Sequence, residues 1–144
     1  MTQSSRNSCL VLPVLSGSMR PYLRAGGQIR IDCAAADRAR PGDIIVFHEA
    51  GRLIAHRLLL CLRLGRRRYL YQRGDAAGIG HWVREKQVLG VVTTSTDVDG
   101  TILYVRGRHD PAARRAVSAH IFRAVLAQAR SVLRTLVAIA RAKR

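Results

Sequence analysis

The sequence predicts a mainly β domain over residues 9–106, followed by a basic amphipathic helix over residues 111–144. Up to about residue 106, short apolar runs alternate with clusters of Gly, Pro and Asp, a pattern typical of short antiparallel strands joined by turns. From Pro111 onward the apolar residues recur at helical spacing instead. We therefore expect a small antiparallel, barrel-like sheet with a C-terminal helix, preceded by a flexible polar N-terminus over residues 1–8.

The strands of this domain can be placed by their apolar runs. Residues 28–33 alternate polar and apolar side chains, which predicts a half-buried strand, and residues 44–47 form a continuous apolar strand. Pro41-Gly42-Asp43 predicts the turn between them. Residues 53–64 predict a longer strand with His56 on the same face as neighbouring apolar side chains. The other strands are expected at residues 9–15, 69–72, 88–93 and 101–105.

The expected C-terminal helix has apolar residues on one side and arginines on the other. Pro111 suits its N-terminus, and Arg123, Arg130, Arg134 and Arg141 gather on one face. Residues 116–141 could contact a membrane surface, or the helix could cap the β domain with its arginines in solvent. The periodicity does not distinguish these two roles.

The chain is strongly basic, with 25 Lys and Arg against 9 Asp and Glu and a formal net charge of +16. Only Lys86 and Lys143 are lysines. Such a charge favours anionic partners: nucleic acid, an acidic membrane surface or an acidic peptide. Aromatic residues are few and no helix-turn-helix pattern precedes the β domain, so a base-stacking or repressor role has little support.

The three cysteines indicate neither disulfides nor a zinc site. Cys9, Cys33 and Cys61 are odd in number, widely spaced and set in apolar strand-like contexts, which predicts buried free thiols. This usage suits a reducing, cytoplasmic compartment, and no metal or cofactor is expected. We also expect no signal sequence and no transmembrane helix, because no uncharged apolar run approaches ~18 residues.

Candidate chemistry begins at the turn after the first expected strand. There Gly17 separates Ser16 from Ser18, and Pro21 stiffens the exit from the turn. A serine is a weak nucleophile unless a base activates it and donors stabilise the oxyanion. His56 and Asp75 are the candidate partners, although a packed strand histidine and a turn-forming aspartate would be ordinary structural roles for them.

Five motifs occur in a fixed order between residues 11 and 93, and together they resemble type I signal peptidases of the archaeal and endoplasmic-reticulum type. The chain also resembles the SOS-repressor autoproteases, which are related to signal peptidases. The motifs are Ser16-Gly17-Ser18-Met19-Arg20-Pro21, Pro41-Gly42-Asp43-Ile44, Ala55-His56-Arg57-Leu58, Gln72-Arg73-Gly74-Asp75 and Leu89-Gly90-Val91-Val92.

The resemblance implies a role for each matching residue. Ser18 would be the nucleophile, and His56 would be the general base, where bacterial signal peptidases and SOS repressors have lysine. Asp75 would orient the imidazole and stabilise its charged form. The Ser16 hydroxyl and the Ser18 backbone N–H would form the oxyanion hole. A histidine with a pKa near ~6.5 can accept the serine proton at neutral pH.

Asp43, Gly74 and Pro21 would hold loops. The chain departs from the family pattern at Gly26-Gly27, where a Gly-Asp pair is usual, and at Ala76-Ala77, where an asparagine is usual. The family's membrane anchor is not expected in this chain, which places cleavage of secreted preproteins at a membrane surface in doubt.

The leading hypothesis is a serine endopeptidase that cleaves an extended leader or signal-like peptide, with small side chains favoured beside the scissile bond as the resemblance implies. The alternative is a catalytically idle protein of the same fold that binds peptide or nucleic acid through its basic surface. A third hypothesis is a peripheral membrane protein attached through residues 116–141.

Overall fold

The computed structural model describes residues 9–76 and 79–105, together with Arg115, Ser118, Ala119 and Phe122. The expected flexible N-terminus (residues 1–8) lies outside this part, as does the expected C-terminal helix except for those four residues. No helical segment in the described ranges is long and apolar enough to cross a membrane.

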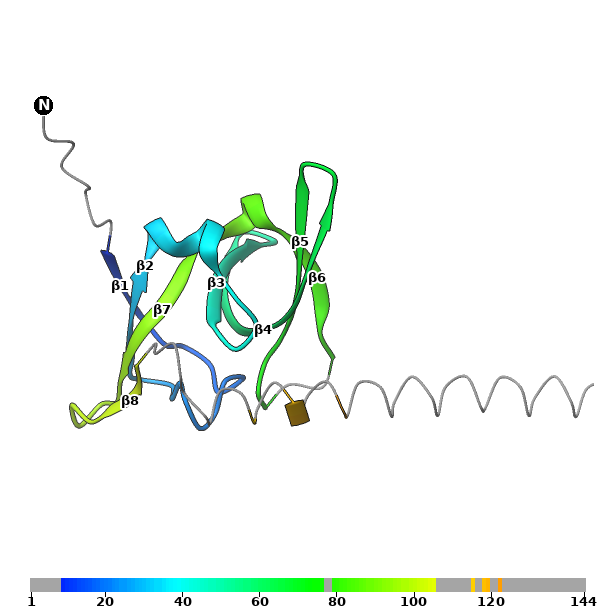
Figure 1. Cartoon of the computed structure of the whole chain (residues 1–144). Helices are drawn as coiled ribbons and strands as arrows, with labels where there is room; N and C mark the ends of the chain where they lie inside the picture. The colour runs from blue at the N-terminus through cyan, green and yellow to red at the C-terminus, as the bar shows by residue number, and fades with distance from the viewer. Residues whose placement is uncertain (1–8, 77–78, 106–114, 116–117, 120–121, 123–144) are drawn as a thin grey trace, which may run out of the picture.

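The described residues form one eight-stranded sheet in which every pair of neighbours is antiparallel, which confirms the predicted mainly β class (Figure 1). Two short 3₁₀ helices, η1 (Cys33–Arg38) and η2 (Glu85–Gln87), connect strands. The strands are β1 (Cys9–Pro13), β2 (Gln28–Asp32), β3 (Ile44–Glu49), β4 (Arg52–Leu64), β5 (Arg67–Arg73), β6 (His81–Arg84), β7 (Val88–Thr96) and β8 (Ile102–Val105).

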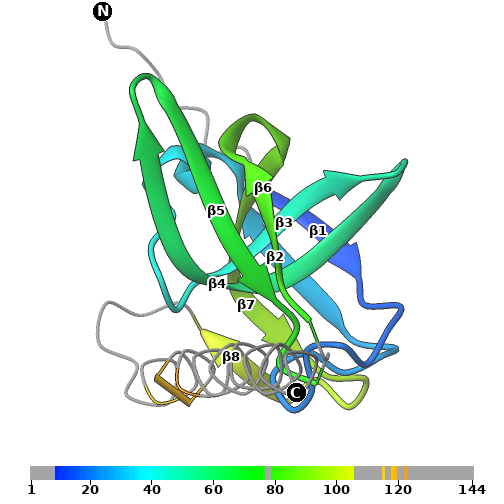
Figure 2. The same ribbon diagram turned by 90° about the vertical axis from the view of Figure 1, so that its right-hand side faces the viewer.

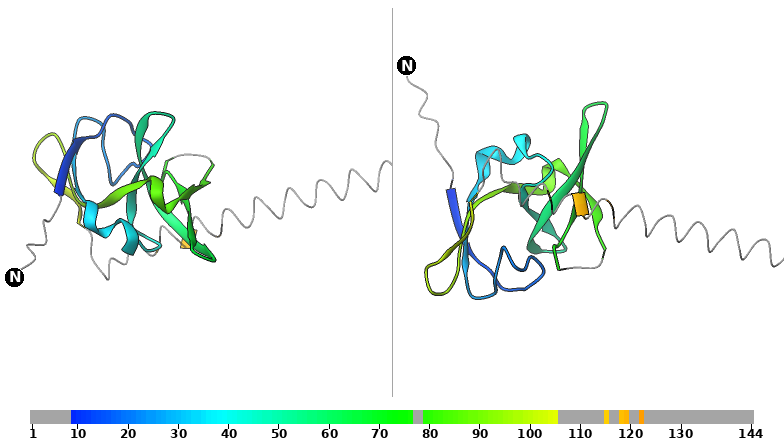
Figure 3. Two further views of the ribbon diagram at one scale, coloured as in Figure 1. Left: turned by 90° about the horizontal axis from the view of Figure 1, so that it is seen from above. Right: turned by 60° about the horizontal axis from the view of Figure 1, so that its bottom comes forward.

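The sheet is curled into a half-barrel. Its strand order is β1-β2-β7-β3-β4-β5-β6, and β8 pairs with β7 beyond the end of β3. Figure 2 shows the long β4–β5 hairpin crossing in front of β2, β7 and β3. Figure 3 shows from two further directions that β1 and the β5–β6 pair lie on opposite sides of the domain.

Strand β3 separates two hydrophobic cores, which explains its continuous apolar sequence. Ile44 and Val46 pack into one core with Met19 and Leu23, whereas Ile45 and Phe47 pack into the other. Successive side chains of a strand point to opposite faces, so a strand buried on both faces needs an apolar residue at every position. The first core anchors the turn that carries Ser18.

Strand β4 does not keep the simple alternation that the sequence suggests. Its pairing with β5 shifts register between Leu58 and Leu60, so Leu59 is an extra residue. As a result the consecutive residues Leu58 and Leu59 are both buried, whereas Leu60 is exposed. A bulge of this kind bends the strand, and it lies directly after the His56-Arg57 pair.

Two other features differ from the sequence-based expectation. Strand β6 was not predicted, because its four residues include only two apolar side chains. The thiols are free, as predicted, but the prediction that they are buried is wrong: Cys9 and Cys61 are exposed, and Cys33 is half-buried. Cys9 begins the edge strand β1 and Cys61 lies in the outer part of β4, so their apolar neighbours face solvent as well.

The central strand β7 depends on Gly90. A Cβ at this position would lie 2.6 Å from the Asp32 carbonyl oxygen and 2.9 Å from the Cys33 Cα, which are backbone atoms that cannot turn away. We predict that Gly90→Ala lowers the free energy of unfolding by about 1–3 kcal/mol. Urea denaturation would measure this, with Thr94→Val on the same strand as a control that changes stability little. An unchanged midpoint for Gly90→Ala would contradict this packing.

Candidate active site

The turn that carries Ser18 is fixed by the residue that follows it. Met19 is buried in the first core, and its carbonyl oxygen accepts a hydrogen bond from the Leu23 N–H at 3.1 Å. Ser18 is therefore held half-buried at the edge of the core. The Ser16 Oγ lies 3.4 Å from the Ser18 Oγ, so the two hydroxyls are neighbours.

Ser18 and His56 line the same pocket. This pocket has a volume of about 800 Å³ and lies between two extended segments, residues 12–16 and residues 52–56. Its walls are mainly apolar, with Met19, Leu23, Ile29 and Val46 at the base. Within the described part of the chain no hydrogen bond joins Ser18 to His56, and the hydroxyl that the Ser18 Oγ contacts is that of Ser16.

His56 is held through one ring nitrogen. Its Nδ1 lies 2.6 Å from the Oε1 of Gln72, a side chain with no solvent exposure. Because an amide oxygen only accepts hydrogen bonds, this contact places a proton on Nδ1, and the neutral ring keeps its lone pair on Nε2. Burial lowers the pKa of His56, against the smaller opposing effect of the Gln72 hydrogen bond, so the ring is neutral at pH 7.

Asp75 is held by Arg57. The Arg57 Nε lies 2.9 Å from Oδ1, and its Nη2 lies 2.7 Å from Oδ2, which makes a bidentate pair. The Arg57 side chain has no solvent exposure and that of Asp75 has 6%. Burial alone would lower the pKa of Arg57, but the hydrogen bonds and the charge of Asp75 outweigh it and raise that pKa.

The Arg57–Asp75 pair also connects the loops around the pocket. Arg57 Nη1 donates to the carbonyl oxygen of Gly42 at 2.8 Å, and its guanidinium lies 4.7 Å from the centre of the Tyr22 ring. The Ala76 N–H donates to the Ser18 carbonyl oxygen at 2.8 Å. The loop that contains Asp75 is therefore docked directly on the serine turn.

The sequence-predicted residues are thus partly brought together. Ser16, Ser18 and His56 share the pocket wall. Asp75 lies beside the serine turn, but the orienting contact to Nδ1 that the resemblance assigns to it is made by Gln72, and both carboxylate oxygens of Asp75 bind Arg57.

The three residues expected to hold loops are found in loops. The Asp43 Oδ2 accepts the Arg40 N–H at 2.9 Å, which closes the turn before β3. Gly74 is buried between β5 and Asp75, and Pro21 follows a cis peptide bond in the serine turn.

Sequence reasoning missed the roles of Gln72 and Arg57, although both stand in quoted motifs. One signal was available for Gln72. In Tyr69-Leu70-Tyr71-Gln72 it has the same parity as Leu70, so it falls on the buried face of a strand, where a polar side chain needs a hydrogen-bonding partner. Arg57 gave no such signal, because its burial depends on contacts with Asp75, Gly42 and Tyr22 from other parts of the chain.

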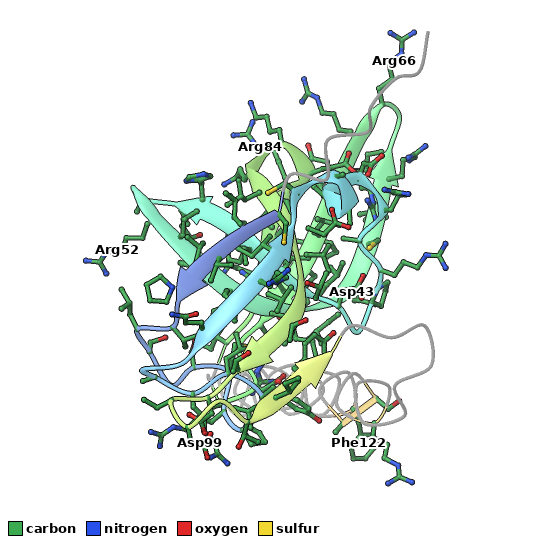
Figure 4. The ribbon with its side chains drawn as sticks, turned by 90° about the vertical axis from the view of Figure 1, so that its left-hand side faces the viewer. Asp43, Arg52, Arg66, Arg84, Asp99 and Phe122 are labelled. Atoms are coloured by element: carbon green, nitrogen blue, oxygen red, sulfur yellow. The ribbon has the colours of Figure 1, made fainter. Side chains whose placement is uncertain are left out.

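Several arginines lie around the domain and point into solvent. Arg52, Arg66 and Arg84 project away from the body of the molecule in Figure 4. Arg52 is also among the residues that line the pocket. In the described ranges no three His, Cys, Asp or Glu side chains lie close enough together to hold a metal ion.

Comparison with known proteins returns no match: no family model, no curated protein and no solved structure is similar to this chain. The likeness to signal peptidases therefore rests on the five motifs alone.

The Arg57–Asp75 pair should dominate the stability of the site. Arg57→Met would leave the Asp75 carboxylate buried without its guanidinium, at a cost of about 3–5 kcal/mol in the free energy of unfolding. Thermal and urea denaturation would measure the loss. Arg66→Met at the exposed tip of the β4–β5 hairpin is the matched control and should change stability little. Equal stabilities for the two variants would contradict the role assigned to the pair.

Proposed function

We propose that this protein is a serine endopeptidase of the signal-peptidase type, with Ser18 as nucleophile and His56 as general base. The observation that carries this proposal is the shared pocket, which both Ser18 and His56 line. His56 is neutral there, and its Nδ1 is hydrogen-bonded to Gln72. Nε2 is then the ring nitrogen that can accept a proton. A half-buried, hydrogen-bonded histidine of this kind is suited to general-base chemistry.

The reaction would follow the usual course of acyl transfer. For this step the Ser18 hydroxyl would have to turn from Ser16 to within hydrogen-bonding distance of Nε2 of His56. The Oγ attacks the peptide carbonyl carbon as Nε2 takes its proton, and the protonated His56 then gives this proton to the leaving amine. Water, deprotonated by the same nitrogen, hydrolyses the acyl-enzyme and releases Ser18.

The oxyanion would be stabilised beside Ser18. The Ser16 hydroxyl already lies 3.4 Å from the Ser18 Oγ, and so close to the place where the carbonyl oxygen becomes negative. Among the residues that the structure describes, none accepts a hydrogen bond from the Ser18 N–H, so this group is available as the second donor. Two such donors are the common arrangement of an oxyanion hole.

The substrate would bind as an added strand. Residues 52–56 of β4 pair with β3 on one side, while β5 begins to pair with β4 only at Arg57. Within the described part of the chain this edge is open where it borders the pocket, opposite residues 12–16. An extended peptide between these segments would gain main-chain hydrogen bonds and place alternate side chains against apolar walls.

Substitution of the two central residues tests the proposal. On a peptide that the wild-type protein cleaves, found by mass spectrometry of a digested peptide library, Ser18→Ala and His56→Ala should each lower kcat by about 10³-fold or more with the fold retained. Ser16→Ala should cost about 10²–10³-fold through the oxyanion alone. Full activity in Ser18→Ala would refute the proposed nucleophile, and a wild-type protein that binds peptides without cleaving them would point to an idle binding protein.

The pH dependence gives a second test. Since burial lowers the pKa of His56, the base stays unprotonated to lower pH than an ordinary histidine, and the acid limb of kcat/KM should fall below about pH 6.5. The Gln72 hydrogen bond raises that pKa, so Gln72→Leu should move the acid limb lower still while reducing the rate at neutral pH. An acid limb at or above pH 7 would contradict a histidine base whose pKa is lowered by partial burial.

A further inference from the structure

His56 lies at one end of a chain of hydrogen bonds that passes through Gln72 of β5 to the partly exposed side chains of His81 on β6 and Glu49 on β3. The Nε2 of Gln72 lies 2.9 Å from the Nε2 of His81, and the same His81 nitrogen lies 2.6 Å from the Oε1 of Glu49. Together with the 2.6 Å contact between His56 Nδ1 and Gln72 Oε1, these contacts join His56, Gln72, His81 and Glu49 in one line. None of the motifs includes His81 or Glu49.

The sheet is built to bring these groups together. Gln72 and His81 are direct partners in the pairing of β5 with β6. The residue before His81 is Gly80, where a Cβ would lie 2.5 Å from the Gln72 carbonyl oxygen, so only glycine lets β6 approach this closely. The Phe47 ring packs edge-on against both imidazoles, with centroid distances of 6.1 Å to His56 and 6.2 Å to His81.

The two contacts of His81 Nε2 compete. A ring nitrogen carries either a proton or a lone pair, so it cannot donate to the Glu49 carboxylate and accept from the Gln72 amide at the same time. Gln72 is fully buried, and a buried amide left with an unmatched partner is costly. Rotation of its terminal amide by 180° exchanges oxygen and nitrogen and relieves the conflict.

We propose that Glu49 and His81 act through Gln72 as positioning residues that set which ring nitrogen of His56 carries the proton. When His81 Nε2 is unprotonated, it accepts the Gln72 amide N–H. The amide oxygen then faces His56, which carries its proton on Nδ1 and keeps Nε2 as the base.

When His81 Nε2 carries a proton and donates it to Glu49, the arrangement reverses. The Gln72 oxygen turns to His81, and the amide N–H donates to His56 Nδ1. His56 then carries its proton on Nε2 and cannot accept one from Ser18. Only the consequence for catalysis rests on the proposed function; the tautomer change itself does not.

The groups that act on this chain come from each neighbouring element. Glu49 on β3 lies at its outer end, with Arg52 of β4 as its partner in the strand register. The charge of Asp75, on the loop after β5, acts on His56, as do those of His81 and Glu49. Glu49 and His81 are partly exposed, with 37% and 44% of their side chains accessible, so solvent protons reach this end of the chain and not the buried amide.

Nuclear magnetic resonance of the imidazole nitrogens tests the proposal without any turnover. In the wild-type protein near neutral pH, His56 should carry its proton on Nδ1, and it should change to the Nε2–H form as His81 takes up its second proton. Glu49→Ala removes the acceptor for a proton on His81 Nε2, so at a given pH a smaller fraction of His56 should be in the Nε2–H form. His81→Phe keeps a ring against Phe47 and should abolish the change.

His48→Gln, at the exposed neighbouring position of β3, is the matched control and should leave the tautomer change where the wild type has it. A His56 that keeps one tautomer until it becomes charged, or a change that is the same in His81→Phe as in the wild type, would overturn the proposal. An inactive protein that shows the change would overturn the proposed function and not this inference. An active protein that lacks it would overturn this inference alone.

Discussion

The buried ion pair of Arg57 with Asp75 is the interaction on which the rest of the site depends. Removing a guanidinium from water is costly, and the cost is offset here because nearly every face of the group is used. Asp75 binds one edge, the Gly42 carbonyl oxygen accepts another N–H, and the Tyr22 ring covers one face. These contacts tie the turn before β3, the loop after β5 and the serine turn to a single residue of β4.

The neighbouring residue His56 gains its position from the same strand. Successive side chains of a strand point to opposite faces, so Arg57 fixes the strand on one side while His56 reaches Gln72 on the other. Because His56 and Arg57 are adjacent in β4, the position of the candidate base depends on the Arg57–Asp75 ion pair. A loss of the pair would displace both Ser18, through the docked Ala76 N–H, and His56, through β4.

The partner of His56 distinguishes this arrangement from a Ser-His-Asp triad. A carboxylate on Nδ1 would stabilise the imidazolium, whereas the Gln72 amide is neutral and stabilises it less. Burial holds the pKa of His56 below its ordinary value, and the hydrogen bond to Gln72 raises that pKa only in part. An amide can present either its oxygen, which accepts, or its N–H, which donates, whereas both oxygens of a carboxylate only accept. The tautomer of His56 therefore depends on the group that Gln72 contacts on its other side, which is His81.

The sequence predicted those elements whose structure depends on residues close together in the chain. Pro41-Gly42-Asp43 forms the predicted turn, with positive φ at Gly42, and the apolar run of residues 44–47 is the strand between the two cores. The bulge at Leu59, the exposure of Cys9 and Cys61 and the existence of β6 could not be predicted, because each depends on which strands become neighbours. The same holds for the site: the sequence places Ser18 and His56 in motifs, but the pairing of β5 with β4 and β6 decides that Gln72, and not Asp75, binds the imidazole.

The central claim is that Ser18 is a nucleophile activated by His56, and covalent labelling addresses it without knowledge of the substrate. A fluorophosphonate should react with the wild-type protein, and mass spectrometry of the digested adduct should place the phosphonyl group on Ser18 and not on Ser16. His56→Ala should lose the label while Ser16→Ala retains part of it. An adduct on Ser16, or labelling that persists unchanged in Ser18→Ala, would contradict the account.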